Sequence, residues 1–316
     1  MKRAWIIGLL LLAGIPGYGA DQVHSLEVRL LSTMLADEGF GEWGFAALVI
    51  ADGHRILFDT GAHPDTVLRN ARELHIDLSD VPDVILSHHH LDHTAGLLPL
   101  RQEYARSNPA ALAHAYAGAG IFRSRTDDGT SEANPMIAIR GQYAAAGGTI
   151  IEYREPHELF PGVWLTGPVP RKYPEKNWSP GTKLRLADGS LVEDNLPEDQ
   201  SLVVVTGKGL VVISGCGHAG IINTMEYARA RISPAPVYAA IGGFHLFNAN
   251  EDTLTWTASK LREFGLQNLL GAHCTGIEAV YRLRQLIGLE RRTAAVGAVG
   301  GGFTLAGGLD PGAIAR

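Results

Sequence analysis

Hydrophobic and polar residues alternate over the early part of the chain, which is the pattern of half-buried β-strands. Strands are expected at residues 26–31 and 45–51, and a third at residues 55–59 after the turn signal Asp52-Gly53. Between residues 64 and 74 the apolar positions recur at helical spacing instead, which predicts a helix. The first half therefore combines a sheet with at least one covering helix.

The second half of the chain alternates apolar strand-like runs with helical patterns. Further strands are expected at residues 149–153, 163–165, 201–206, 210–214, 237–241 and 268–272, and helices at residues 221–231, 253–264 and 276–287. Strands that alternate with helices in this way are typical of an α/β protein.

Three stretches carry weaker signals. Residues 109–117 are Ala-rich and favour neither a helix nor a strand, while the Gly, Ser and Asp residues of 123–134 predict a loop that is a candidate lid or specificity insertion. The Gly-rich run 297–302 lacks the Lys and Ser/Thr of a phosphate-binding loop and is expected to be a turn or a close-packed strand. No repeat or low-complexity linker divides residues 21–316, which are expected to form a single domain.

The N-terminus has the three regions of a secretory signal peptide. Lys2 and Arg3 precede an apolar run that ends near Leu12, and small residues follow up to Ala20. We expect cleavage near Gly19 or Ala20 and an exported protein, periplasmic or secreted. No other stretch reaches about 20 uninterrupted apolar residues, so stable insertion in a membrane is not expected after cleavage.

Charge narrows the class of partner. Loss of Lys2 and Arg3 takes the formal net charge from −6 to −8, and the chain carries no basic stripe or aromatic platform of the kind that nucleic-acid binders use. A small-molecule substrate is therefore expected rather than a nucleic acid. The oligomeric state cannot be inferred from the sequence.

The richest chemical signal is His88-x-His90-x-Asp92-His93, which places four potential metal ligands within six positions. Imidazole and carboxylate groups suit Zn(II), Mn(II) or Fe(II). Four such ligands are more than the three that a catalytic site with one metal and an open position usually has. A histidine-rich surface turn is the alternative, but a strand-like run precedes the motif and a helix-like run follows it. A ligand-bearing turn at a strand end explains both, and it could serve two neighbouring metals.

Three later histidines each follow a predicted strand. His218, His245 and His273 come after residues 210–214, 237–241 and 268–272, and parallel strands would bring such ends to one crevice. The remaining isolated histidines, expected at the surface or in satisfied core positions, are His24, His54, His63, His75, His114 and His157.

Two cysteines, Cys216 and Cys274, each lie close to a histidine in the sequence. An oxidising compartment would permit a disulfide between them. Their context favours a role as a metal ligand or as a free thiol near a metal. All three interpretations remain open at the level of the sequence.

These motifs together resemble the metallo-β-lactamase superfamily. The resemblance rests on the His88 to His93 motif and on Leu57-Phe58-Asp59-Thr60-Gly61 before it. It implies a single-domain α/β fold, the four-layer αββα sandwich. It also implies that His88 and His90 bind one metal, that Asp92 and His93 bind a second, and that Asp59 orients the main loop.

The resemblance extends to the subgroup named for the dihydropterin-methyl-(ribofuranosyl)aminobenzene-phosphate synthase of methanopterin synthesis. The segments that carry it are Asn70-Ala71, Leu86-Ser87-His88, Asp199-Gln200-Ser201-Leu202, Ser214 to Ile221, Gly242-Gly243-Phe244-His245-Leu246 and His273-Cys274-Thr275-Gly276. The usual third histidine motif has no clear counterpart, so His218 is the best substitute for its ligand. Cys216 stands near the usual bridging aspartate, and His245 resembles the later histidine motif.

The expected function is that of an exported metal-dependent hydrolase. One or two divalent ions, Zn(II) first and Mn(II) or Fe(II) next, would lower the pKa of a bound water and produce a nucleophile against a small ester, lactone, amide or phosphoester. Asp92 would belong to this catalytic centre, and His273 would contact a substrate phosphate or carboxylate or stabilise developing charge. The alternatives are a transferase of the synthase type, a β-lactamase proper, and a metal-binding or sensory protein with little turnover.

Overall fold

The computed structural model describes residues 21–178 and 181–315. The predicted signal peptide lies outside these residues. None of the helices in the described part is long and apolar enough to cross a membrane.

The first large sheet has eight strands and carries the predicted N-terminal strands at its centre. In spatial order its strands are β20 (Gly308–Asp310), β19 (Gly302–Thr304), β1 (Leu26–Ser32), β3 (Ala46–Ala51), β4 (His54–Phe58), β5 (Asp83–Leu86), β6 (His114–Gly118) and β8 (Thr149–Tyr153). From β4 to β8 the strands are parallel, so their carboxyl ends lie at one edge. The ambiguous stretch 109–117 contributes to β6.

The second large sheet has seven strands. In spatial order they are β17 (Ala294–Val296), β16 (Asn268–Gly271), β15 (Val237–Gly242), β14 (Gly209–Ser214), β13 (Ser201–Thr206), β10 (Val163–Leu165) and β9 (His157–Phe160). Strands β14 to β17 run parallel, and the register sets Ser214 beside Gly242 and Gly242 beside Gly271. The segments that follow these three strands therefore start at the same level.

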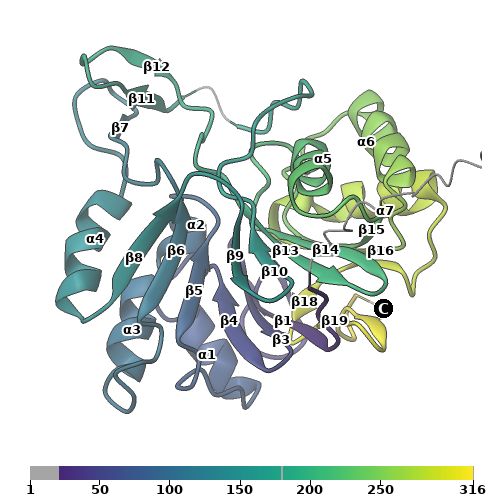
Figure 1. Ribbon diagram of the computed structural model, residues 1–316, viewed down its shortest axis with the longest axis horizontal. Coiled ribbons are helices and arrows are strands. Elements are labelled where there is room, and N and C mark those ends of the chain that lie inside the picture. Colours follow the sequence, from purple (N-terminus) through teal and green to yellow (C-terminus); the bar gives the residue numbers. More distant parts are fainter. Residues whose placement is uncertain (1–20, 179–180, 316) are drawn as a thin grey trace, which may run out of the picture.

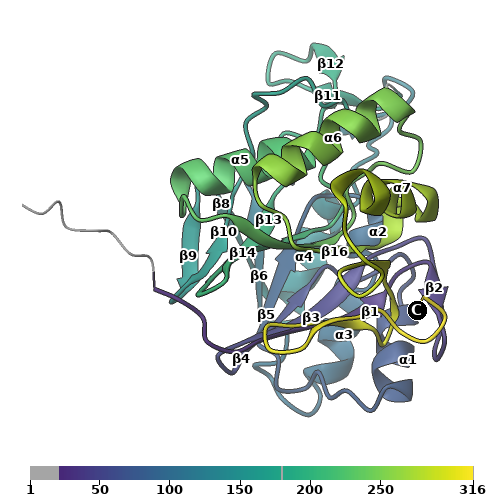
Figure 2. The same ribbon diagram turned by 90° about the vertical axis from the view of Figure 1, so that its right-hand side faces the viewer.

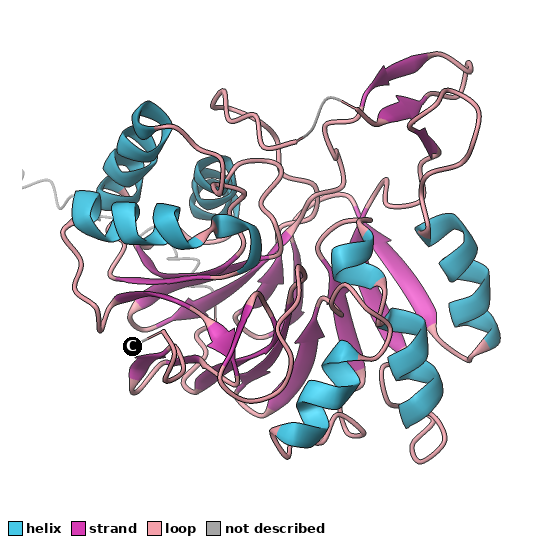
Figure 3. Cartoon of the chain, turned by 180° about the vertical axis from the view of Figure 1, so that it is seen from behind, coloured by secondary structure: helices cyan, strands magenta, loops and turns pink. Residues whose placement is uncertain are grey.

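Helices cover the outer face of each sheet. Those beside the first sheet are α1 (Thr66–Glu73), α3 (Leu97–Tyr104) and α4 (Met136–Ala145), and those on the second sheet are α5 (Ile221–Arg231), α6 (Glu251–Glu263) and α7 (Ile277–Ile287). Figure 2 shows α5, α6 and α7 on one side of the stacked strands and α1 and α3 on the other, and Figure 3 shows both groups from behind. The predicted αββα sandwich is confirmed.

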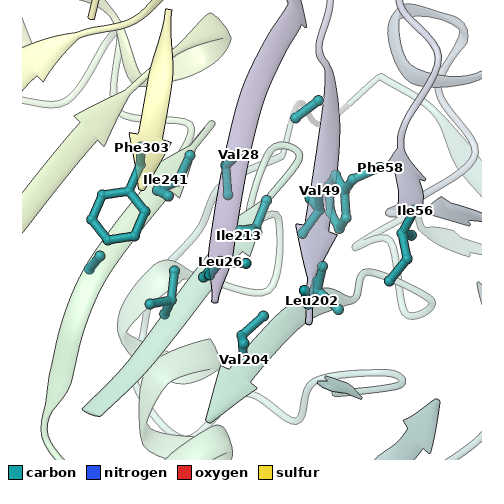
Figure 4. Close-up of a cluster of buried hydrophobic side chains, with 14 of the residues drawn as sticks. Leu26, Val28, Val49, Ile56, Phe58, Leu202, Val204, Ile213, Ile241 and Phe303 are labelled. Atoms are coloured by element: carbon teal, nitrogen blue, oxygen red, sulfur yellow. The ribbon is translucent and has the colours of Figure 1, made fainter. Parts of the chain in front are cut away.

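A hydrophobic core fills the space between the sheets. Val49 of β3 and Phe58 of β4 face Leu202 and Ile213 of the other sheet (Figure 4). Their neighbour Leu48 points to the opposite face, toward the covering helices. Since side chains alternate along a strand, burial of both faces explains why these strands are apolar almost throughout.

Two small sheets complete the fold. The first consists of β12 (Leu191–Glu193), β11 (Lys183–Arg185) and β7 (Arg125–Thr126), and it stands apart from the sandwich in Figure 1. The second pairs β18 (Ala298–Val299) with β2 (Leu35–Ala36). The prediction of a plain loop over residues 123–134 is thus wrong at β7, because this segment pairs with a strand far along the chain.

The Gly-rich run 297–302 holds β18, a turn at Gly300 and the start of β19, so it contains both the turn and the close-packed strand that were the predicted alternatives. A Cβ atom on Gly302 would lie 1.8 Å from the carbonyl oxygen of Val28. No larger residue fits between β19 and β1 at this point.

Candidate metal centre

The His88 to His93 motif follows the carboxyl end of β5. Ser87 links the strand to His88, and a short helix, α2 (Leu91–Thr94), carries Asp92 and His93. An extended residue at His90 precedes this helix. The turn therefore presents consecutive ligand side chains at the edge of the first sheet.

The second sheet supplies its groups from the matching edge. Cys216 and His218 follow β14, His245 follows β15, and His273 and Cys274 follow β16. Because these parallel strands end in register, their three loops meet in front of the first sheet's turn. The convergence predicted for the strand-end histidines is confirmed.

Distances between side chains of the two sheets are short. His93 Nε2 lies 3.1 Å from Cys216 Sγ, and His273 Nε2 lies 3.3 Å from Asp92 Oδ2. The ring of His88 packs 4.6 Å from the ring of His218, measured between centroids. Residues more than 100 positions apart thus form one cluster.

The cluster divides into overlapping groups of donor atoms, each group lying within 4.8 Å. These groups are Asp92, His93, Cys216 and His273; His88, Cys216 and His218; His88, His90 and Asp92; and Cys216, His245 and Cys274. Cys216 belongs to three of them, so it occupies the central position of the cluster. Every predicted metal ligand lies in at least one group.

The donor set fits divalent metal ions. His218 Nε2 and His245 Nδ1 are buried atoms with no hydrogen-bond partner among the described residues. Buried polar atoms are normally paired, so unpaired imidazole nitrogens aimed at other donors point to a missing ion. Nitrogen, sulfur and carboxylate donors at this spacing are those that zinc accepts.

Burial keeps three histidines of the cluster in the neutral form that binds metals. It lowers the pKa of His88 and His218 well below the usual value and that of His90 to about 3, so these imidazoles are neutral. Burial would raise the pKa of Asp92, but His93 and His273 outweigh it and the net shift is downward. Neutral imidazoles beside an ionised carboxylate are the protonation states that ligation requires.

Asp59 lies directly behind His93. Its Oδ2 is 2.7 Å from His93 Nδ1 and also accepts a hydrogen bond from Ser87 Oγ, while Oδ1 accepts one from the Ser87 backbone. This arrangement leaves His93 Nε2 to face the cluster. A Cβ atom on Gly215 would meet Ser87 Oγ at 2.2 Å, so glycine is needed for the loops to approach.

A second buried network holds the histidine turn, and the sequence did not reveal it. His89 Nδ1 lies 2.8 Å from Glu198 Oε1, and Arg125 bonds both Glu198 and Asp194 at 2.6 Å. All four side chains are nearly or fully buried. The one sequence signal that could have pointed to Glu198 is its position directly before Asp199-Gln200, a segment that carries the family resemblance.

The cysteines are free thiols in the structure, and both are buried. Their Sγ atoms lie 3.2 Å apart, beyond the length of a disulfide bond. Burial raises the pKa of the Cys216 thiol. The isolated histidines named above stay outside all four donor groups found in the described residues.

A cavity of about 250 Å³ opens in front of the cluster. Its lining includes His90, Asp92, Cys216, His218, His245, His273 and Cys274, together with Trp43, Thr182, Asp194, Leu196 and Phe247. Trp43 and Phe247 are 47% and 41% exposed, and their rings meet edge to face with centroids 5.3 Å apart. Two exposed aromatic side chains therefore border the cavity.

Two stacked sheets between helical layers carry nitrogen, sulfur and oxygen donors at their strand ends, and they define an αββα sandwich protein with a candidate metal site. The family model of the metallo-beta-lactamase superfamily matches residues 44–230, which is more than half of the chain. The chain belongs to this superfamily of metal-dependent enzymes.

The relatives are consistent with the predicted subgroup. The chain is 32% identical over 234 residues to the 7,8-dihydropterin-6-methyl-4-(beta-D-ribofuranosyl)-aminobenzene-5'-phosphate synthase of Methanocaldococcus jannaschii, covering 71% of this chain and 76% of that protein. It is 30% identical to an uncharacterised protein of the same organism, covering 78% of this chain and 89% of the relative.

Solved structures show the same fold. Tm1679, a metal-dependent hydrolase of the beta-lactamase superfamily, superposes with a TM-score of 0.68 at 27% identity, covering 83% of this chain and 93% of its own. The metallo-beta-lactamase fold protein YhfI from Bacillus subtilis gives a TM-score of 0.56 at 12% identity, covering 89% of this chain and 99% of its own. The second similarity concerns the fold alone.

Proposed function

We propose that the chain is a metal-dependent hydrolase of a small ester, lactone, amide or phosphoester. One observation carries the proposal: ligand groups from both sheets converge on a cavity large enough for the reacting part of a small molecule. Membership of the superfamily and the similarity to Tm1679, which is described as a metal-dependent hydrolase, support the same reaction class.

The donor groups suggest how two ions would be held. His88, His90 and His218 would bind one, Asp92, His93 and His273 the other, and Cys216 would lie between them. In this assignment His273 becomes a ligand rather than the substrate contact expected from the sequence. A thiol among imidazoles favours Zn(II) over Mn(II).

Bound divalent ions would supply Lewis acidity and a nucleophile at neutral pH. The chain's own residues prepare the site for that chemistry. Asp59 fixes the orientation of the His93 ring through Nδ1, and Glu198 does the same for His89. Trp43 and Phe247 add apolar rings to the border of the cavity.

The test combines metal quantification with turnover. Purified protein from residue 21 onward should contain one or two zinc ions and hydrolyse at least one member of an ester, lactone, amide and phosphoester panel. His88→Ala and Asp92→Ala should lose metal and activity together, whereas His54→Ala, an exposed histidine outside the cluster, should keep both. Activity retained after loss of metal would defeat the proposal.

A transferase reaction of the synthase type is the second candidate, because the relative that is 32% identical bears a synthase name. Incubation with a dihydropterin diphosphate and an arylamine distinguishes the two. Coupled product with no hydrolysis of the panel would favour the transferase. Stoichiometric metal with neither reaction would favour a metal-binding or sensory protein, and a nitrocefin assay covers the β-lactamase alternative.

We also propose export, which rests on the sequence of residues 1–20 alone. Expression of the full chain in a bacterium with two membranes, followed by fractionation, should place a shortened protein in the periplasm. Its N-terminal sequence should begin near residue 20 or 21. Recovery of the uncut chain from the cytoplasm would contradict this proposal.

A further inference from the structure

A second, larger cavity of about 710 Å³ lies beside the metal centre. His245 and Phe247 line both cavities, so the two are neighbours that share part of a wall. The larger one is lined by residues 174–178, by residues 245–250 after β15, and by the first half of α6. Its size is within the range of sites for small organic ligands.

Aromatic rings form much of its lining. Trp178, Trp256 and Phe247 contribute from three separate segments. Each has a partner in the structure: Trp178 Nε1 donates to Glu193 at 3.0 Å, the ring of Trp256 meets Tyr173 edge to face, and the ring of Phe247 meets Trp43 edge to face. Rings fixed in this way offer flat apolar surfaces at little cost in conformational entropy.

The charges of the lining do not suit an anion. Lys176 is the only lysine or arginine among its described residues, and its Nζ lies 3.3 Å from Glu193 Oε1. Glu175 and Asp252 are acidic, and burial raises the pKa of Glu175 to about 7. Apart from these three and His245, the polar lining consists of neutral groups such as Asn177 and Asn248.

We infer that this second cavity binds an uncharged aromatic part of the substrate and that Trp178 and Trp256 select it. This inference rests on the proposed function, because the bound aromatic group is part of a substrate only if the chain is the proposed hydrolase. Since His245 and Phe247 line both cavities, an aromatic group in the larger cavity would lie next to the cavity that holds the donor cluster. The substrate class is then a small aryl-bearing ester, lactone, amide or phosphoester.

Binding tests the inference without requiring turnover. Zinc-loaded protein is titrated calorimetrically with 1-naphthol, with its saturated analogue decahydro-1-naphthol and with the anion naphthalene-2-sulfonate. We expect 1-naphthol to bind at least fivefold more tightly than either. Trp178→Leu and Trp256→Leu should each weaken 1-naphthol binding about tenfold, because each loses one aromatic contact.

Trp164→Leu is the matched control, since Trp164 is a half-buried tryptophan of β10 outside the described lining and the substitution is the same. It should bind 1-naphthol within twofold of the parent. Thermal unfolding of each variant verifies folding, and two variants on separate segments guard against a local defect in either. Equal binding of the three probes, or unchanged binding in both tryptophan variants, would overturn the inference.

The outcomes separate this inference from the proposed function. Selective naphthol binding with no hydrolysis of any ester, lactone, amide or phosphoester defeats the hydrolase and leaves the aromatic site. Hydrolysis that neither tryptophan variant alters, for aryl and alkyl substrates alike, defeats the aromatic site and leaves the hydrolase.

Discussion

Three residues of the metal centre have backbone conformations that favour glycine. The φ angles of Asp59, His245 and His273 are 56°, 49° and 45°. Such conformations cost on the order of 1 to 3 kcal/mol each in non-glycine residues and persist where surrounding contacts enforce them. Here the hydrogen bonds of the Asp59 carboxylate and the bond from the His273 backbone to Thr33 Oγ1 provide that enforcement.

Asp59→Asn tests the positioning role at the scale of one residue. Asparagine tolerates the same backbone conformation, so the change removes the carboxylate charge and leaves the loop. We expect the affinity for zinc to fall by about 10- to 100-fold, because asparagine has one acceptor oxygen where the Asp59 carboxylate uses two, for the Ser87 backbone and for Ser87 Oγ and His93 Nδ1. Competition with a chromogenic chelator measures it. Asp188→Asn, at an exposed turn, is the control, and equal affinities in all three proteins would contradict the role.

Cys216→Ser tests the central thiol. Protein loaded with Co(II) should show sulfur-to-metal charge-transfer absorption in the near ultraviolet, because Cys216 lies within three of the donor groups. The band should disappear in Cys216→Ser and persist in Cys274→Ser, whose sulfur belongs to one group. A band that survives in Cys216→Ser would remove this residue from the ligand set.

At the scale of elements, β7 fastens the small sheet to the histidine turn through one side chain. Arg125 is fully buried and pairs with Asp194 and Glu198. Arg125→Met should lower the free energy of unfolding by about 3 to 5 kcal/mol, because two buried carboxylates lose their partner. Urea unfolding measures it. Arg123→Met, two residues earlier and exposed, should change it by less than about 0.5 kcal/mol. Similar values for the two variants would contradict the anchoring role.

The same network predicts a pH dependence. Burial would raise the pKa of Glu198, but the hydrogen bond from His89 and the charge of Arg125 outweigh it and hold that pKa at about 2. A depressed carboxyl pKa gives stability that is full above about pH 4.5 and is lost as the pH falls toward 2. Unfolding free energies measured between pH 6 and pH 2.5 should therefore fall more steeply in the parent than in Glu198→Gln. Parallel curves would show that Glu198 does not titrate as described.

The sequence predicted the strongly patterned elements and missed the weakly patterned ones. Strands β13 and β14 are apolar throughout and were found, because both faces are buried. Helix α4 was missed because it buries only Met136 and Tyr143, while Ile137 is exposed, so its apolar residues do not mark one face. Strand β12 is exposed along its length and pairs only within the small sheet.

For the whole molecule, the metal centre joins the two sheets. Ligands from the His88 to His93 turn meet those that follow β14, β15 and β16. Metal that binds only the folded state stabilises it by mass action, by about 2.7 kcal/mol at a concentration 100 times Kd. Removal of zinc with a chelator should lower the midpoint of thermal unfolding by about 5 °C. His88→Ala should show a smaller shift, and an unchanged midpoint in the parent would contradict the coupling.

The side chains of the donor cluster were predictable because their sequence signals are local. His88 to His93 form a contiguous motif, and each later histidine follows a recognisable strand. The residues that hold the histidine turn were not predictable. Arg125 and Glu198 are 73 positions apart, and only the folded structure shows that they form a buried ion pair. The pair of aromatic side chains that borders the cavity, Trp43 and Phe247, was not predicted either, because the two residues meet only in the folded chain.

The distance along the sequence between the two sets of ligands also bears on which metal the protein acquires. His93 and Cys216 are 123 positions apart, so the centre is complete only after both sheets have formed and packed. A chain that is still unfolded offers short clusters of donors but not the shared thiol position between them. Ion choice is therefore made in the compartment where folding finishes, and the abundance of free metals there competes with the intrinsic preference of the ligands. If the cluster holds a metal as proposed, the ion that it carries depends on the compartment in which the chain folds as well as on the sequence.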